Sequence, residues 1–170
     1  KKVLVYKTVK ALDIWNAIVN SAWMSAEPGL HFIDRSNKMS NSWYFSRLQA
    51  TNPCGEQGLE GYGVCTLGAI NLSTFVDNDG DVLWDKLRDV IKTSVRMLDD
   101  VIDVNEYHFP EISDNHQSNR RIGLGVMGFA EMLIRVGLRY GSDDASLFTD
   151  ALFETIAEAA YLASIDLAKE

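Results

Sequence analysis

Three side chains suited to chemistry stand at alternate positions: the amide of Asn52, the thiol of Cys54 and the carboxyl of Glu56. The residues between them restrict the backbone. Pro53 fixes its own φ angle and favours an extended Asn52, whereas Gly55 accepts a turn that residues with a side chain resist. If the segment is extended, alternate side chains point to the same side. We therefore expect an amide, a thiol and an acid/base group to face one small substrate.

A second thiol, Cys65, follows eleven positions after Cys54 on an apolar segment. Two thiols beside a polar pocket can supply two electrons by forming a disulfide. Free cysteine is often a small buried hydrophobe, which is the structural alternative for Cys54. The polar neighbours and Glu56, a potential proton acceptor, favour chemistry. Hydrolysis is disfavoured because no histidine stands in a suitable base position and Glu56 would oppose a thiolate.

The composition favours one compact domain. A chain of 170 residues can bury a core but is too short to indicate two domains. Its formal net charge of −8 argues against a nucleic acid or an anionic membrane as partner, because such partners favour clustered lysine and arginine. The chain shows neither an apolar run of spanning length nor a signal-like N-terminus. These features predict a cytoplasmic protein.

The cysteines and histidines do not indicate a metal site. Two cysteines are too few for a disulfide scaffold. His31, His108 and His116 lack the spacing of metal ligands, so we interpret each as a surface or capping residue and predict no bound metal.

The hydrophobic pattern predicts an α/β fold rich in helix. Helical periodicity covers residues 11–26, and a long apolar stripe from Leu83 to Ile102 predicts a second helix that Asp81 caps. The last predicted helix begins after the cap residue Ser142.

Strands are predicted over residues 30–34 and 64–72, with a short one over residues 138–140. The adjacent aromatic residues Trp43, Tyr44 and Phe45 are interpreted as anchors that hold a loop on the core, with the wall of a ligand site as the alternative.

Residues 123–128 match the pattern G-x-G-x-x-G and are predicted to open a helix. A dinucleotide site would need a strand before the glycines and an acidic residue ending a second strand roughly twenty residues later. Neither is present, so we expect these glycines to allow close packing of a helix on a strand.

Two neighbouring segments carry a family resemblance. Residues 52–57, with the sequence Asn-Pro-Cys-Gly-Glu-Gln, and residues 63–72 resemble the active-site finger loop of the ribonucleotide reductase catalytic subunit. Residues 28–35 and 121–128 are similar to family segments in the same order. The amino-acid sequence of the loop and its spacing to Cys65 are most similar to those of class II, adenosylcobalamin-dependent enzymes. Some class I subunits share both features.

The resemblance implies a fold and a place within it. It implies that residues 1–170 are a single segment of an alternating α/β barrel of the ten-stranded type, with a central finger loop at about residues 50–66. It also implies a substrate site made of Asn52, Pro53, Cys54, Gly55 and Glu56.

The same resemblance implies a role for each reactive residue. Cys54 would become a thiyl radical and take the 3′-hydrogen of a ribonucleotide. Glu56 would accept the proton of the 3′-hydroxyl group, and Asn52 would bind the ribose hydroxyls. Cys65 would be one of the two thiols that reduce the 2′ position after water leaves.

The implied cofactor is adenosylcobalamin, bound largely by parts of the protein outside this chain. In the class I alternative, no cofactor is bound directly, and a metal-containing partner subunit supplies the radical. The implied partners are a ribonucleoside di- or triphosphate, a thioredoxin-type reductant that acts through C-terminal cysteines, and a second copy in a homodimer.

The chain also departs from the family pattern. It has no third cysteine to pair with Cys65, and the allosteric region, the phosphate loop and the C-terminal cysteine pair are absent. We therefore expect the 170 residues alone to be inactive. Two alternatives from other classes stay open, a nucleotide-binding module that uses the loop at Gly123 and a helical interaction domain with incidental cysteines.

Overall fold

The computed structural model describes residues 3–170, and the chain divides into two compact units, Lys1–Leu48 and Gln49–Glu170. The first unit contains helices α1 (Ala11–Ser25) and α2 (Ile33–Met39). The predicted helix over residues 11–26 is thus confirmed to within one residue.

The predicted strand over residues 30–34 is wrong. Phe32 precedes the first turn of α2, and both Leu30 and Phe32 are exposed. Periodicity cannot separate a strand from a helix start in an apolar run of this length, and the described residues of the first unit offer it no strand to pair with.

The aromatic residues Trp43, Tyr44 and Phe45 do not anchor their loop to a core. All three are exposed, and they stack edge to face on one another, with ring centroids 6.0 and 4.9 Å apart. The loop is held instead by the Asn37 amide, which donates to the Leu48 carbonyl at 3.0 Å and accepts from the Leu48 N–H at 2.9 Å.

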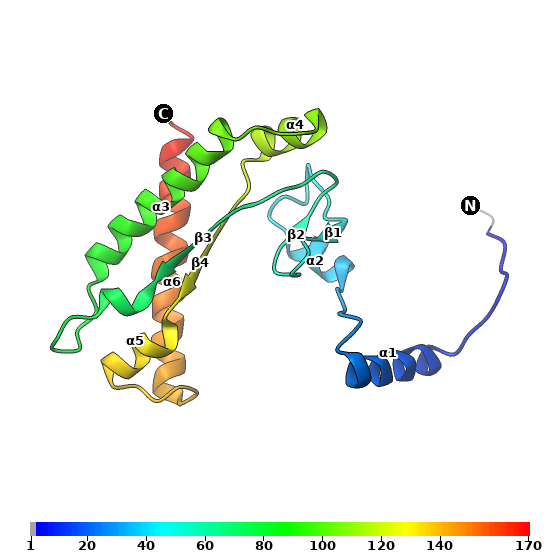
Figure 1. Cartoon of the computed structure of the whole chain (residues 1–170), viewed down its shortest axis with the longest axis horizontal. Coiled ribbons are helices and arrows are strands. Elements are labelled where there is room, and N and C mark those ends of the chain that lie inside the picture. Colours follow the sequence, from blue (N-terminus) through cyan, green and yellow to red (C-terminus); the bar gives the residue numbers. More distant parts are fainter. Residues whose placement is uncertain (1–2) are drawn as a thin grey trace. The chain divides into compact units, whose positions relative to one another are not determined.

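The second unit is built around two parallel strands, β3 (Thr66–Asn71) and β4 (Ile122–Met127). They pair in register from Thr66 opposite Ile122 to Asn71 opposite Met127. Helices α3 (Trp84–Val104) and α4 (Pro110–Asn119) form the crossover that parallel strands need (Figure 1).

Helix α6 (Asp143–Leu167) packs beside α3, and the two lie side by side in Figure 1. The short elements η1 (Leu72–Phe75) and α5 (Phe129–Val136) pack on each other after the two strands. Burial of apolar side chains is the main stabilising term for such a unit. The largest fully buried side chains are Leu72, Leu87, Ile91, Val95, Ile102, Met132, Leu133 and Leu152.

A helix follows the glycine motif at residues 123–128, as predicted, but only the last residue of the motif, Gly128, caps it. The first five residues of the motif lie inside β4, and α5 begins only after Gly128. Parallel pairing with β3 uses the backbone of this segment, so the motif packs strand against strand and does not form the strand-to-helix turn of a dinucleotide site.

Three further boundaries differ from expectation. Residues 138–140 form no strand, because Gly137 ends α5 in a left-handed conformation and the chain turns. The helix α4 was not predicted. Leu83, not Asp81, precedes α3; Asp81 instead belongs to the preceding turn, where its N–H donates to the Asp77 carboxylate at 2.9 Å. The predicted Ser142 cap is confirmed, with its hydroxyl accepting from the Ala145 N–H at 3.2 Å.

The unit is α/β and rich in helix, as predicted. Residues 3–170 contain one parallel strand pair and one antiparallel hairpin, so a ten-stranded barrel is not closed within the described chain. None of the helices described is both long and apolar enough to span a membrane.

Candidate active site

The segment with the alternating reactive residues forms a hairpin. Strands β1 (Ala50–Thr51) and β2 (Gly58–Leu59) pair antiparallel, and the loop between them turns at residues 52–55. The Gly55 N–H donates to the Asn52 carbonyl at 3.0 Å, with Pro53 at the second position of the turn and Gly55 at a φ of +83°. The extended conformation expected for this segment is therefore wrong, because its proline and glycine close a turn.

The Asn52 side chain stabilises the loop. Its Oδ1 accepts from the Gln57 N–H at 3.0 Å, while the Asn52 N–H donates to the Gln57 carbonyl at 3.1 Å. Among residues 3–170 the Asn52 amide nitrogen has no hydrogen-bond partner, so both of its hydrogens can be donated to another molecule.

Cys54 and Glu56 lie on the open side of this turn. Both are exposed, as are Pro53 and Gly55. The turn thus presents the thiol at its tip, where a reactive group bound outside the hairpin can reach it.

Cys65 lies in a different environment, one residue before β3. It is half-buried, and its Sγ lies against Gly123 of β4, where an added Cβ would stand 3.0 Å from the sulfur. Burial raises the pKa of the Cys65 thiol, the positive charge of Arg121 opposes this shift, and the carboxylates of Glu56 and Glu60 add to it. Glu56 of the hairpin and Gly123, against which the Cys65 sulfur lies, line the same cavity.

A cavity of about 530 Å³ is lined by residues of both the hairpin and the strands β3 and β4. Its lining comprises Glu56 and Gln57 from the hairpin, residues 67–69 of β3 and residues 123–125 of β4. Two of the three β4 residues in this lining, Gly123 and Gly125, are glycines and add no side chain to it. The cavity therefore offers a space of small-molecule size beside a carboxylate and near a thiol.

Glu60 and Arg121 form a shielded ion pair that nothing in the sequence pattern indicated. Glu60 Oε2 accepts from Arg121 Nη2 at 2.7 Å, and Glu60 Oε1 accepts from Asn119 Nδ2 at 2.8 Å. Burial alone would raise the pKa of Glu60, but its own backbone N–H, Asn119 and Arg121 together lower it below the ordinary value. The two partners are 61 positions apart in the chain, which is why only the fold reveals them.

His116 is buried, so its interpretation as a surface or capping residue is wrong. Its Nδ1 lies 2.8 Å from the Tyr107 hydroxyl and its Nε2 lies 3.0 Å from the Arg121 carbonyl. A carbonyl can only accept, so Nε2 carries a hydrogen. In the part of the chain that the structure describes, no three His, Cys, Asp or Glu side chains group as a metal site would require.

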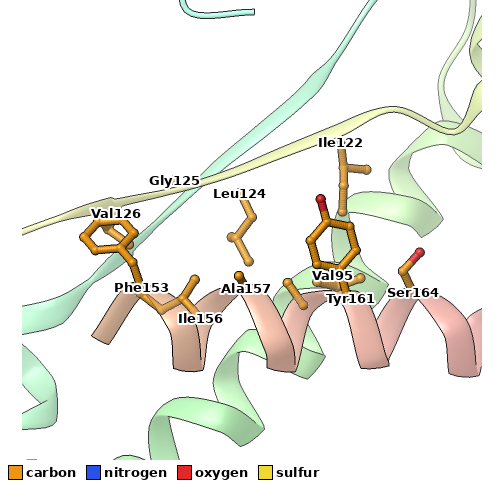
Figure 2. A pocket seen from close by; sticks show the side chains of 11 residues that line it. Val95, Ile122, Leu124, Gly125, Val126, Phe153, Ile156, Ala157, Tyr161 and Ser164 are labelled. Carbon is orange, nitrogen blue, oxygen red and sulfur yellow. The ribbon is translucent and has the colours of Figure 1, made fainter. Parts of the chain in front are cut away.

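A second cavity, of about 380 Å³, lies between β4 and α6. Figure 2 shows Ile122 and Leu124 of β4 directed toward α6, with Tyr161 and Ser164 as the polar groups that face it. Its lining has no charged side chain. Of these two cavities, the one at Glu56 is therefore the one that has a carboxyl group for acid/base chemistry in its lining.

The comparisons with known proteins cover the whole chain. Residues 1–170 match the family model described as ribonucleotide reductase, barrel domain. The chain is 41% identical over 170 residues to a vitamin B12-dependent ribonucleoside-diphosphate reductase of Thermoplasma acidophilum, a match that covers 100% of this chain and 22% of the relative.

Two further relatives are also matched over most of this chain and over a small part of their own length. A vitamin B12-dependent ribonucleoside-diphosphate reductase of Mycobacterium tuberculosis (strain CDC 1551 / Oshkosh) is 44% identical over 160 residues, which are 94% of this chain and 23% of the relative. A ribonucleoside-diphosphate reductase subunit alpha of Chlamydia pneumoniae is 36% identical over 173 residues, covering 99% of this chain and 16% of the relative. The chain thus spans less than a quarter of the length of these relatives. The resemblance inferred from residues 52–57 is confirmed: this chain belongs to the ribonucleotide reductase family and corresponds to part of its barrel domain.

Proposed function

We propose that this chain is the radical-bearing part of a ribonucleoside-diphosphate reductase. The observation that carries the proposal is the hairpin turn, which presents Cys54 at its tip and directs Glu56 into the cavity beside the Cys65 segment. The full-length family match supports the reaction class, and the names of the relatives support a diphosphate substrate. All 170 residues would form one segment of the barrel domain, with the finger loop at about residues 50–66.

In this proposal the three turn residues act on the ribose. Cys54, as a thiyl radical, takes hydrogen from C3′ and later returns it. Glu56 accepts the proton of the 3′-hydroxyl group, for which its position on the cavity wall is suited. Asn52 donates from its amide nitrogen to the ribose hydroxyls, since its oxygen is engaged within the loop.

The reduction itself uses Cys65 and a second thiol from outside these 170 residues. The C2′–O bond breaks and its oxygen leaves as water. Two thiols lose two electrons and become a disulfide, and C2′ gains hydrogen. Because this chain contains only Cys54 and Cys65, and Cys54 is used for the radical, the second thiol must come from another segment. A thioredoxin-type reductant would then restore both thiols.

Vitamin B12, in its adenosylcobalamin form, is the cofactor that the relatives' names support. When bound, it supplies the radical that Cys54 receives. The exposed Cys54 thiol fits such a donor, since the turn leaves the sulfur open to a group held by other parts of the protein. No side-chain cluster within residues 3–170 provides a metal site, so this chain's contribution would be the thiol.

The test uses the complete enzyme with Cys54→Ser and, as a matched thiol control, Cys65→Ser. With Cys54→Ser we expect no deoxyribonucleotide and no removal of tritium from a 3′-tritiated substrate, while equilibrium dialysis still shows substrate binding. With Cys65→Ser we expect tritium to reach solvent through the Cys54 thiol while deoxyribonucleotide formation is lost. Substantial turnover by the Cys54→Ser enzyme would refute the proposal.

The class I reading differs only in the source of the radical, and the subunit alpha of Chlamydia pneumoniae is the relative that favours it. Turnover with adenosylcobalamin and no second subunit supports the B12-dependent assignment. Turnover that requires a separate metal-containing subunit supports the alternative.

A further inference from the structure

The connection that leads from the hairpin to Cys65 is fixed to β4 by side chains at its start. Glu60, directly after β2, binds both Arg121 and Asn119, at 2.7 and 2.8 Å. The Asn115 amide also donates to the Gly61 carbonyl at 3.2 Å. These contacts join the start of the connection to the end of α4 and the start of β4.

The strand register places Arg121 beside Cys65. Thr66 pairs with Ile122, so the residues that precede each of them, Cys65 and Arg121, stand opposite one another. The Thr66 N–H donates to the Arg121 carbonyl at 3.4 Å, and the Cys65 sulfur lies against Gly123, two positions beyond Arg121. Because side chains alternate along a strand, Cys65, Arg121 and Gly123 share the face that borders the cavity at Glu56.

We propose that Arg121 is a positioning residue for Cys65: it fixes the connection before Cys65 to β4 through Glu60, and it faces the thiol with its positive charge. The effect of Arg121 on turnover rests on the redox role proposed for Cys65. The effect of Arg121 on the Cys65 thiol does not depend on that role.

The ion pair is shielded enough to act in this way. The side chains of Arg121 and Glu60 are only 18% and 6% exposed, so their charges are weakly screened by water. Arg121 Nε is buried and has no hydrogen-bond partner among residues 3–170. The guanidinium is thus engaged on the side of Glu60 alone, and its position depends on that carboxylate.

The charged groups that act on the Cys65 thiol are Arg121, Glu56 and Glu60. Arg121 lowers the pKa of the thiol, and the two carboxylates raise it, in addition to the larger effect of burial. Arg121→Met leaves the bond between Glu60 and Asn119 in place, and Glu60→Gln keeps a side-chain oxygen that can still accept, so either variant loosens the connection only in part. The two ends nevertheless carry opposite charges, so the protonation of Cys65 responds in opposite directions if the charges act on it.

The experiment compares Arg121→Met and Glu60→Gln in the complete enzyme. The rate of iodoacetamide alkylation is measured against pH for Cys65 and, as an internal control, for Cys54, by mass spectrometry of the two peptides. We expect Arg121→Met to raise the midpoint of the Cys65 profile and to slow its alkylation roughly three- to tenfold at a fixed pH below that midpoint. Glu60→Gln is expected to lower the midpoint. The Cys54 profile should change in neither variant.

Two further variants complete the design. Arg121→Lys keeps the charge and should restore the Cys65 midpoint. Arg120→Met is the matched control, since the Arg120 guanidinium binds Asp99 and Asp103 of α3 and not Glu60. It should leave the Cys65 midpoint unchanged.

Movement of the midpoint in the same direction in Arg121→Met and Glu60→Gln, or no movement in either, would overturn the proposal, because loosening alone would then explain the result. If Arg121→Met fails to fold, the proposal is judged from Glu60→Gln, which must lower the Cys65 midpoint, with Arg121→Lys as the variant that must leave the midpoint unchanged; no lowering in Glu60→Gln would then overturn the proposal. Alkylation requires no turnover, so failure of this proposal and failure of the proposed reaction are separate outcomes.

Discussion

Gly128 is the glycine of the 123–128 motif that the fold requires most strictly, and its replacement by alanine gives a quantitative test. Its φ of +70° lies in the left-handed region, which costs a residue with a side chain about 1–2 kcal/mol. An added Cβ would also collide with the Asn71 side-chain oxygen and stand 3.2 Å from the Ser73 backbone nitrogen.

The collision has a cost of its own because Asn71 caps η1. Its Oδ1 accepts from the Ser73 N–H at 3.2 Å and from the Ser73 hydroxyl at 2.9 Å. Moving this oxygen removes a cap, a loss of about 1 kcal/mol and up to about 2. We therefore expect Gly128→Ala to lower the free energy of unfolding by about 2–4 kcal/mol.

Two other glycines separate the contributions. Gly137 has a similar φ of +83° but nothing within 4 Å of an added Cβ, so Gly137→Ala measures the backbone cost alone, about 1–2 kcal/mol. Gly125 lies in β4 without a positive φ, and its added Cβ would meet only the Gly68 carbonyl oxygen, at 3.7 Å. Gly125→Ala should leave stability unchanged or raise it by about 0.5–1 kcal/mol.

Urea unfolding, followed by far-ultraviolet circular dichroism, gives the change in the free energy of unfolding for each of the three variants. The changes follow from the urea concentrations at the unfolding midpoints, provided that all variants share the same dependence of this free energy on urea. The expected order of destabilisation is Gly128→Ala, then Gly137→Ala, then Gly125→Ala. The reasoning is refuted if Gly128→Ala costs no more than Gly137→Ala, because the Asn71 contact would then contribute nothing.

Two other substitutions test the electrostatics and the helix ends. The pKa of Glu60 is lowered in the folded chain, so its carboxylate contributes stability above the ordinary carboxyl pKa and loses it as pH falls through the lowered value. The stability advantage of the native chain over Glu60→Gln should therefore shrink in acid, as measured by urea unfolding at a series of pH values; a constant difference would contradict this. Ser142→Ala removes the bond to the Ala145 N–H and should cost about 1 kcal/mol, whereas Ser142→Asn should cost little.

The long helices could be predicted because their pattern repeats over many residues. In α3 the side chains of Leu87, Ile91, Val95, Leu98 and Ile102 recur at helical spacing, and all five are buried. A stripe of this length distinguishes a helix from a strand without knowledge of its partner.

The strand β4 could not be predicted in the same way. Glycines at 123 and 125 take the places where an alternating pattern would show side chains, and the partner strand β3 lies more than fifty positions earlier. A parallel pair depends on such distant pairing, which local propensity does not report. The strand prediction for residues 30–34 was wrong for a related reason, since a run of five residues is too short to define a period.

The reactive residues were identifiable from the sequence, but their arrangement was not. Pro53 and Gly55 mark a turn as readily as a rigid extended segment, and the hydrogen bond from the Gly55 N–H to the Asn52 carbonyl decides for the turn. The pair of Glu60 and Arg121 carried no local signal, because each is an ordinary charged residue until the fold brings the two together.

The two faces of β4 explain why a glycine-rich strand suits this position. Ile122, Leu124 and Val126 line the cavity toward α6 (Figure 2), Gly123 lines the cavity at Glu56, and Leu124 and Gly125 line both. Gly125 has no positive φ, and an added Cβ would make only an ordinary contact, so neither backbone conformation nor packing among residues 3–170 demands glycine there. What glycine provides at 125 is the absence of a side chain in the lining of the cavity that Glu56 also lines. The motif that matches the dinucleotide-binding pattern thus leaves room on the surface where the proposed substrate would lie.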